Sequence, residues 1–227
     1  MVNPCGKPAR HVLTDDVHGL GWGPTKPSTM KKTIILLALL GVTSAAFAAA
    51  EIGQPAPAFT ATDITGATHS LSDFKGKIVV LESYNPDCPY VANHYGTGAM
   101  QALQAELIAK GVIWLMVNSV HDQHRSYRPP AKARQEWADK KVKATAWLDD
   151  HSGEIAKAYG MRTTPHMFVI AADGTLAYQG AIDDRAVTNG DPREARNYIR
   201  EAVTQLLAGD APKVTRTKPY GCGVYTR

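Results

Sequence analysis

An apolar strand that leads to a cysteine and a proline constrains the fold of this chain most strongly. Residues 78–81 (Ile-Val-Val-Leu) form a continuous hydrophobic run, which is typical of a strand buried on both faces of a sheet. Cys88 and Pro89 follow that strand. Pro89 suits the first position of a helix, because the N–H that proline lacks would have no partner there. The sequence therefore predicts a buried strand, then Cys88, then the start of a helix.

Cys88 is expected to be reactive in that position. Helix N–H groups and the helix dipole stabilise a thiolate, and such a placement can lower a cysteine pKa from about 8.5 to below about 7.5. The neighbouring Asp87 opposes this effect, since a negative charge disfavours the thiolate. The direction of the Asp87 side chain decides the outcome. The alternative interpretation of Cys88 is an inert buried cysteine.

The segment 30–48 has the pattern of a secretory signal. Two lysines precede the apolar run 34–40, and Ala46-Phe47-Ala48 is a small-x-small cleavage site. The run is shorter than the roughly 20 apolar residues that span a bilayer. We expect an exported, periplasmic protein with no membrane span after cleavage; a permanent N-terminal anchor is the alternative. Residues 1–29 are expected to be an over-extended reading frame in front of a true start at Met30.

The remaining part, 49–227, is expected to form one domain with one core. The first 48 residues hold five of the 25 Lys and Arg residues and two of the 21 Asp and Glu residues, so the net charge falls from +4 to +1. Nothing in this balance indicates a nucleic-acid or acidic-membrane partner. The domain keeps Cys88 and Cys222. Two cysteines in an exported domain indicate either one disulfide or a working thiol with a partner.

Strands and helices are expected to alternate along this domain. Further strands are predicted at residues 112–117, 144–148, 167–170 and 176–178. Helices are predicted from Pro89 towards a C-cap at Gly111 and at residues 131–141, 153–159 and 193–207. The tail from Gly209 onwards reads as irregular. This order predicts an α/β fold with a central mixed sheet flanked by helices.

Three segments resemble the redoxin families, namely thioredoxin-like proteins of the TlpA type and peroxiredoxins of the alkyl-hydroperoxide-reductase type. They are Gly53–Phe59, Ser70–Lys77 and Val80–Val91. The resemblance implies a thioredoxin-like fold in which Cys88 corresponds to the attacking cysteine. Val91 stands where thioredoxins carry the second, resolving cysteine. Resolution must therefore come from Cys222 or from another molecule.

The resemblance also assigns candidate roles around Cys88. Glu82 lies six residues before it, where thioredoxins carry a buried acid that transfers a proton; an exposed strand glutamate is the alternative. Pro165 corresponds to a cis-proline that leaves neighbouring backbone groups free to pair with a bound peptide. Thr164 and Pro165, together with Pro89 and Tyr90, are thus expected to shape a substrate groove.

Peroxiredoxins have a threonine three residues before the cysteine and a distant arginine, both directed at the peroxide. This chain has Asn85 and Pro165 at the corresponding positions, with Arg162 and Arg185 as candidate substitutes. The C-terminal pieces, residues 180–185 and 219–224, resemble one peroxiredoxin-like branch whose proteins end in a similar Gly-Cys segment. Cys222 lies between two glycines, which suits a thiol that must approach another site closely.

A metal site is not expected. The histidines at positions 94, 121, 124, 151 and 166 include no set of three or four with zinc-like spacing. Cys88 with His94 could still serve a copper carrier. We expect no cofactor.

The leading hypothesis is an exported thiol-disulfide oxidoreductase that acts through Cys88, with Cys222 as the resolving cysteine. Its partners would be a protein or small-molecule disulfide, or a peroxide, and an external thiol reductant. An atypical thiol peroxidase is the first alternative. The second is a non-catalytic binding module or copper carrier, in which Cys88–Cys222 is a structural disulfide.

Overall fold

The structure is a computed structural model, and it describes Gly23 and residues 50–226. The predicted signal segment 30–48 lies outside the described residues, as does the predicted over-extended segment 1–29 apart from Gly23. None of the helices formed by the described residues has the length and hydropathy of a membrane span.

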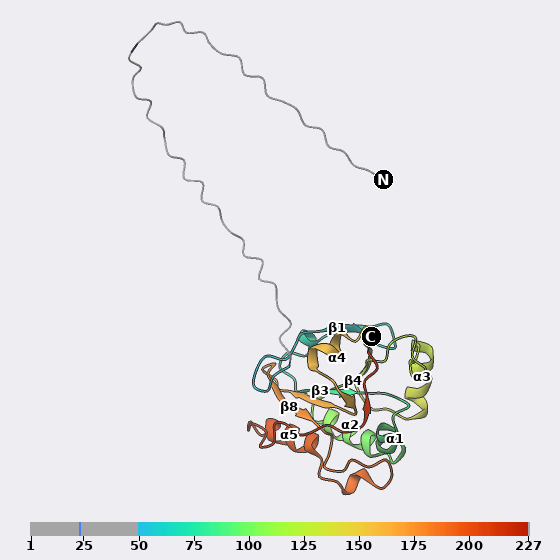
Figure 1. Cartoon of the computed structure of the whole chain (residues 1–227). Helices are drawn as coiled ribbons and strands as arrows, with labels where there is room; N and C mark the ends of the chain where they lie inside the picture. The colour runs from blue at the N-terminus through green and yellow to red at the C-terminus, as the bar shows by residue number, and fades with distance from the viewer. Residues whose placement is uncertain (1–22, 24–49, 227) are drawn as a thin grey trace, which may run out of the picture. The chain divides into compact units, whose positions relative to one another are not determined.

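A five-stranded sheet forms the centre of the domain (Figure 1). Its strands are β3 (Val79–Ser83), β4 (Ile113–Asn118), β5 (Ala146–Asp149), β7 (Met167–Ile170) and β8 (Leu176–Gly180), in the order β5-β4-β3-β7-β8. The strands β5, β4 and β3 are parallel, whereas β7 and β8 are antiparallel to their neighbours. The predicted mixed sheet is confirmed.

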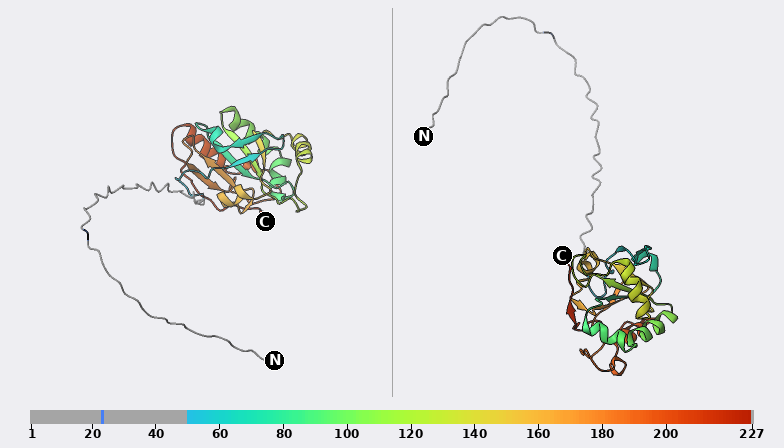
Figure 2. Two further views of the ribbon diagram at one scale, coloured as in Figure 1. Left: turned by 90° about the horizontal axis from the view of Figure 1, so that it is seen from above. Right: turned by 90° about the vertical axis from the view of Figure 1, so that its right-hand side faces the viewer.

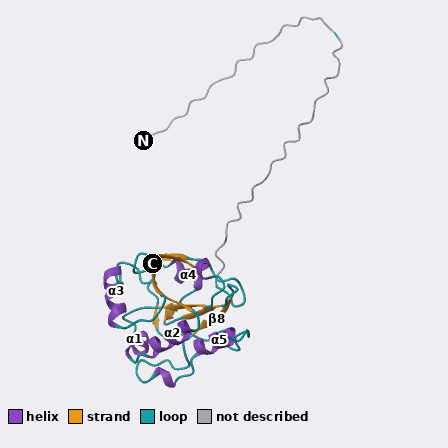
Figure 3. Ribbon diagram, turned by 180° about the vertical axis from the view of Figure 1, so that it is seen from behind, coloured by secondary structure: helices purple, strands orange, loops and turns teal. Residues whose placement is uncertain are grey.

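Helices cover both faces of this sheet (Figure 3). They are α1 (Pro89–Gly96), α2 (Ala99–Ala109), α3 (Pro130–Asp139), α4 (Glu154–Tyr159) and α5 (Tyr198–Leu207). Figure 1 shows α4 on one side of the sheet and α1, α2 and α5 on the other. The predicted α/β architecture is thus confirmed.

The strand before the cysteine is buried on both faces, as its continuous apolar run predicts. Val80 packs in the cluster that contains the apolar side chains of α1, α2 and α5. Val79 and Leu81 point to the opposite face and pack with Ile155 and Tyr159 of α4. Side chains alternate between the two faces of a strand, so both faces must be apolar when helices cover both.

Two predicted helices differ from the observed ones in their bounds. The helix expected from Pro89 to Gly111 is interrupted between α1 and α2, because Gly98 has a φ of +79°, in the left-handed region that ends a helix. The last helix, expected from Arg193, begins at Tyr198. The side chain of Asn197 accepts a hydrogen bond of 2.8 Å from the Arg200 N–H and so caps α5 at this point.

Several short elements complete the domain. They are β1 (Thr60–Thr62), β2 (Thr68–Ser70), the 3-10 helices η1 (Leu71–Phe74) and η2 (Pro192–Glu194), β6 (Thr163–Thr164) and β9 (Cys222–Gly223). The strands β1 and β2 form a hairpin, and β6 pairs with β9.

The C-terminal tail was predicted to be irregular, and most of it is. It nevertheless follows the sheet closely, since Gln179 of the edge strand β8 donates to the Thr215 carbonyl and accepts from the Thr217 N–H. The tail then crosses to β6, where its residues Cys222 and Gly223 form β9. The right-hand view of Figure 2 shows β9 beside α1. The tail therefore brings Cys222 to the end of the apolar strand, where Cys88 lies.

Candidate active site

Cys88 is the N-cap residue of α1 and lies between β3 and that helix, as predicted. Its residue is 0 % exposed. The thiol lies 2.8 Å from the Thr164 carbonyl oxygen, to which it can donate. Pro89 takes the first helical position. The strand, the proline and the helix thus hold the sulfur in one fixed place, against the segment that precedes Pro165.

The pKa of Cys88 is lowered from its ordinary value. Burial raises it, but hydrogen bonds to the thiolate outweigh the burial. They come from the Thr164 side chain, from the Val91 backbone N–H, and from both the side chain and the backbone of Cys222. Donors that converge on a sulfur favour its charged form. Cys88 is therefore disposed to act as a nucleophile.

The second cysteine reaches this site through strand pairing. The Thr164–Pro165 peptide bond is cis, as the resemblance implied. The segment before it, β6, pairs antiparallel with β9, with Thr164 opposite Cys222. Gly221 lies so close to the Thr164 carbonyl that a Cβ there would overlap it, and its φ of +124° favours glycine. Both cysteines are free thiols.

The pKa of Cys222 is shifted in the opposite direction to that of Cys88. Its pKa is raised to about 12, first by burial and then by its hydrogen bond to Cys88 and by the charge of Cys88. A negative charge on one thiol disfavours a second negative charge beside it. Of the two thiols, Cys88 therefore loses its proton first, and Cys222 keeps its own.

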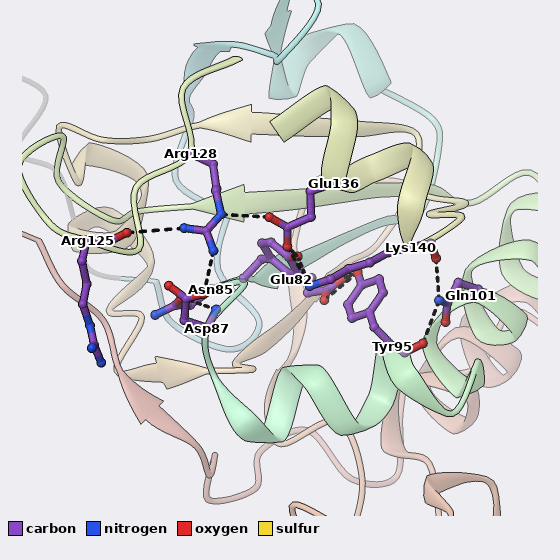
Figure 4. A network of polar contacts seen from close by, with 10 residues as sticks. Glu82, Asn85, Asp87, Tyr95, Gln101, Arg125, Arg128, Glu136 and Lys140 are labelled. Carbon is purple, nitrogen blue, oxygen red and sulfur yellow. Dashed lines mark hydrogen bonds and ion pairs between the residues drawn. The ribbon is translucent and has the colours of Figure 1, made fainter. Parts of the chain in front are cut away.

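Arg128 pairs with Asp87, whose negative charge was expected to disfavour the Cys88 thiolate. Its Nη2 lies 2.6 Å from Asp87 Oδ1, and its Nε lies 2.9 Å from Glu136 Oε2 (Figure 4). Burial raises the pKa of Asp87, but its hydrogen bond with Arg128 is the main reason that the net change is downward. The negative charge next to Cys88 is thus paired. Sequence reasoning missed Arg128, because no local pattern connects it to Asp87.

The same network extends into the core. Glu136 of α3 accepts from the Tyr84 hydroxyl at 2.8 Å and lies 2.7 Å from Lys140 Nζ. Figure 4 shows this chain of contacts passing from Arg128 through Glu136 to Lys140. Because Glu136 contacts two cations and a hydroxyl, it holds Arg128 in the position that faces Asp87.

Glu82 is fully buried in β3, which excludes the exposed alternative. Its carboxylate accepts from the Trp114 indole N–H at 2.8 Å and from the Tyr95 hydroxyl at 3.0 Å, with Gln104 Nε2 at 3.4 Å. Burial raises its pKa to about 7, against the lowering effect of these hydrogen bonds. A carboxyl that titrates near neutral pH can give or take a proton.

A second polar cluster anchors the tail two residues before Cys222. The Tyr220 hydroxyl donates to Asp183 Oδ1 at 2.6 Å and lies 3.2 Å from His94 Nε2. Burial lowers the pKa of His94 to about 4, so this imidazole is neutral at neutral pH. Its 3.6 Å contact with Asp183 is consequently not an ion pair there. The Tyr90 ring lies 5.6 Å from the Tyr220 ring.

Beyond Cys222 the tail is held by an aromatic contact. The Tyr225 ring stacks on His124 with 4.2 Å between centroids, and the His121 N–H donates to the Tyr225 carbonyl at 3.0 Å. His94, the residue suggested for copper, contacts Tyr220 and Asp183. Within residues 50–226, no group of three or more His, Cys, Asp and Glu side chains could hold a metal ion.

Two of the residues considered for peroxide binding, Asn85 and Arg185, have side-chain contacts of their own. Asn85 Oδ1 accepts from the Asp87 N–H at 3.0 Å. Arg185 forms an exposed ion pair with Glu194 at 3.0 Å. The Arg162 backbone N–H donates to His166. These contacts give Asn85 a structural use and keep the Arg185 guanidinium with Glu194.

The four residues expected to shape a groove lie together, and the tail covers two of them, Thr164 and Pro165, while Pro89 stays exposed. Thr164 pairs with Cys222, and Pro165 follows it directly. Pro89 begins α1, and Tyr90 faces Tyr220. The backbone edge that was expected to be free for a peptide is thus occupied by the chain's own residues. Sequence reasoning missed this, since a two-residue strand has no periodicity to detect.

Comparisons with known proteins agree with this geometry. A model of the AhpC/TSA family matches residues 52–179, more than half of the chain. Among solved structures, an uncharacterized conserved protein from Geobacillus kaustophilus is similar with a TM-score of 0.69 and 27% identity, over 78% of this chain and 93% of that one. A hypothetical protein from Sinorhizobium meliloti reaches a TM-score of 0.69 at 23% identity, over 79% and 97%.

A third solved structure has a similar fold. It is a candidate thiol:disulfide interchange protein DsbE from Chlorobium tepidum, with a TM-score of 0.50 and 23% identity, over 71% of this chain and 98% of that one. No curated protein sequence matches the chain. The predicted thioredoxin-like fold is confirmed.

Proposed function

Because this chain belongs to the AhpC/TSA family, we propose that it is a two-cysteine thiol oxidoreductase in which Cys88 attacks and Cys222 resolves. The observation that carries the proposal is that strand pairing brings the two cysteines to one backbone position. The Cys88 thiol lies 2.8 Å from the Thr164 carbonyl oxygen, Thr164 pairs with Cys222 in the β6–β9 ladder, and each cysteine shifts the pKa of the other. A structural disulfide would need no such difference in pKa between its two cysteines.

The proposed reaction has two exchanges. The Cys88 thiolate attacks one sulfur of a disulfide R–S–S–R′, so that a Cys88–S–S–R bond forms and R′S⁻ leaves. Cys222 then loses its proton, which a released thiolate takes up, and its sulfur attacks Cys88; the Cys88–Cys222 disulfide forms and RS⁻ leaves. The substrate disulfide is reduced by two electrons, and the two cysteines are oxidised. An external dithiol reductant returns both thiols by the reverse exchange.

The difference in pKa determines which of the two thiols reacts first. The hydrogen bond and the charge of Cys88 account for two of the three causes that raise the Cys222 pKa. Both causes disappear once Cys88 is bound in a mixed disulfide, because its sulfur is then neutral. Cys222 thus becomes easier to deprotonate when its thiolate is needed. This order keeps Cys222 from competing with Cys88 for the substrate.

Glu82 is proposed as the proton-transfer group of the site. Its pKa of about 7 lies near neutral pH, where a single carboxyl can both accept and release a proton. Its carboxylate lies in a buried network with Trp114, Tyr95 and Gln104, on the strand that precedes Cys88. Thr164, Pro165, Pro89 and Tyr90 are proposed to contact the substrate when the tail is displaced.

Export to an oxidising compartment such as the periplasm is also part of the proposal. It rests on the signal-like segment 30–48. A disulfide-exchange protein has most substrates where disulfides form and persist. Sequencing the N-terminus of the exported protein should give a start at Ala49 or within a few residues. A product that retains Met30 would contradict this part of the proposal.

Mass spectrometry of single-cysteine variants tests the reaction. With 2-hydroxyethyl disulfide, we expect the wild type to form an internal disulfide, Cys222→Ser to retain one adduct on Cys88, and Cys88→Ser to lose turnover. Hydrogen peroxide should oxidise the wild type about 100-fold more slowly than peroxiredoxins react, because Asn85 and Pro165 stand where peroxiredoxins have the threonine and arginine directed at the peroxide. Turnover by Cys88→Ser would overturn the proposal, and rapid peroxide consumption would favour the thiol peroxidase.

A further inference from the structure

A strap formed by residues 220–226 closes the site over Cys88. Cys88 is 0 % exposed, although its sulfur must reach a substrate to react. The strap residues Tyr220 and Cys222 pack against the core cluster that contains Cys88, and Val224 packs on the other face. In the closed state the attacking sulfur is therefore out of reach of any disulfide. The strap must lift before the first exchange.

The strap also occupies one particular binding surface. It pairs with β6 as an antiparallel strand, with Thr164 opposite Cys222 and Thr163 opposite Gly223. An extended peptide that binds a sheet edge uses the same backbone N–H and C=O groups. Cys222 consequently stands where the cysteine of such a peptide would meet Cys88. The strap therefore competes with an extended peptide for the backbone groups of β6.

Resting on the proposed function, we propose that the strap restricts this protein to small disulfides and excludes extended peptide and protein disulfides. A small disulfide needs only an in-line approach to the Cys88 sulfur. A partial lift of the Cys222 side chain provides it. An extended peptide also needs the backbone groups of Thr163 and Thr164, so both pairs of β9 must break. The closed strap thus penalises a peptide more than a small molecule.

The Tyr220 hydroxyl is the latch of the strap: its hydrogen bond sets the cost of opening the strap for a peptide. It donates to the buried Asp183 at 2.6 Å, and the other Asp183 oxygen accepts no hydrogen bond within residues 50–226. By contrast, the side chain–backbone bond between Thr164 Oγ1 and the Cys222 carbonyl is long, at 3.5 Å. A two-residue ladder is marginal alone. Loss of a hydrogen bond to a carboxyl group should shift the opening equilibrium about tenfold.

The strap offers a matched control for the latch. Tyr225 is a second tyrosine of the same segment, and its ring stacks on His124. Its hydroxyl has no hydrogen bond among the described residues, whereas that of Tyr220 has Asp183. Tyr220→Phe and Tyr225→Phe therefore delete the same atom from the same strap. Only the first removes a contact that keeps the strap closed.

The experiment measures capture of a disulfide by Cys88 in the full chain carrying Cys222→Ser, where no thiol can release the adduct. The two probes are 2-hydroxyethyl disulfide and a seven-residue peptide whose central Gly-Cys-Gly is linked through its cysteine to 2-mercaptoethanol. Rate constants come from stopped-flow mixing and mass spectrometry. We expect the small probe to react at least about tenfold faster than the peptide, since each tenfold ratio corresponds to one lost contact of this kind.

Tyr220→Phe should raise the peptide rate about tenfold and the small-probe rate less than about threefold, while Tyr225→Phe changes neither. Gly221→Ala gives a second route, because its Cβ would push the strap from the Thr164 carbonyl; Gly223→Ala, with no atom within 4 Å, is its control. Equal rates for both probes in the starting protein, or a ratio that neither variant changes, would overturn the strap proposal. Failure of Cys88 to capture either probe would instead refute the proposed function.

Discussion

Cys88 and Cys222 are residues of the same type that lie in two different regions of the candidate site. Cys88 is set by the core: a buried strand precedes it, a helix begins after it, and its pKa is lowered by the hydrogen bonds that meet there. Cys222 is set by the strap, where a two-residue strand and the Tyr220 hydroxyl hold it. Its pKa is raised, first by burial and then by Cys88 itself.

This difference separates reactivity from access. The core fixes the nucleophile, and a rigid scaffold is needed for a sulfur that must lie in line with its target. The strap is held by a two-residue ladder, by the Tyr220 hydroxyl and by the stacking of Tyr225 on His124, and our proposal requires these contacts to open. In that proposal the resolving thiol approaches after the substrate has bound. Three perturbations test this difference between the two regions.

The largest effect is expected from Glu82→Gln in the core region. The pKa of Glu82 is raised to about 7 from an ordinary 4.5, so the folded protein holds a proton that the unfolded chain releases. This stabilisation is complete below pH 4.5 and is lost as the pH rises through 7. It amounts to roughly 3 kcal/mol in the free energy of unfolding. Urea unfolding between pH 5 and 8 should show a flatter pH dependence in Glu82→Gln.

Glu106→Gln is the control for this measurement. The pKa of Glu106 is lowered: burial raises it, but hydrogen bonds from Arg200 and Lys110 outweigh the burial. Its carboxylate is therefore ionised in both states above pH 5, and the substitution should leave the pH dependence unchanged. If Glu82→Gln and the wild type lose stability in parallel, the core carboxyl is not the source of the pH dependence.

An intermediate effect is expected at Cys222 when Cys88 is removed. In Cys88→Ser the thiolate that opposes ionisation of Cys222 is absent, so the Cys222 pKa should fall from about 12 by roughly one to two units. Thiolate absorbance at 240 nm, recorded against pH, measures this value. In Cys222→Ser the Cys88 pKa should stay below the ordinary thiol value, because the Thr164 side chain and the Val91 N–H remain. A Cys222 pKa that ignores Cys88 would contradict the proposed order of the two thiols.

The smallest effect is expected from Arg128→Met. Without the guanidinium, the Asp87 charge beside Cys88 keeps only Ser126 and the more distant charge of Arg125, and the Cys88 pKa should rise by up to about one unit. Asp87 is partly exposed, so solvent weakens the effect. The rate of iodoacetamide alkylation against pH gives the shift. Adding Asp87→Asn to Arg128→Met should cancel it, whereas a shift that persists in the double variant would mean that Arg128 acts by another route.

Several features of the site could be predicted because they depend on local chemistry. The run 78–81 and Pro89 predict a buried strand and a helix start around Cys88, and both are present. The cis Thr164–Pro165 bond followed from the family resemblance and is confirmed. The bounds of α1, α2 and α5 were less predictable. Gly98 and Asn197 end or begin helices through single backbone and cap contacts that compete with the hydrophobic pattern.

The fold class and the position of Cys88 between a buried strand and a helix start could be read from the sequence, because burial patterns and helix starts are properties of neighbouring residues. What surrounds Cys88 depends on the tertiary structure. Arg128 reaches Asp87, Tyr220 reaches Asp183, and Cys222 reaches Thr164 across long stretches of chain. Such contacts depend on how the elements pack, and packing brings together residues whose separation in sequence carries no periodic signal. Local sequence therefore specifies where Cys88 lies, and packing specifies which residues surround it.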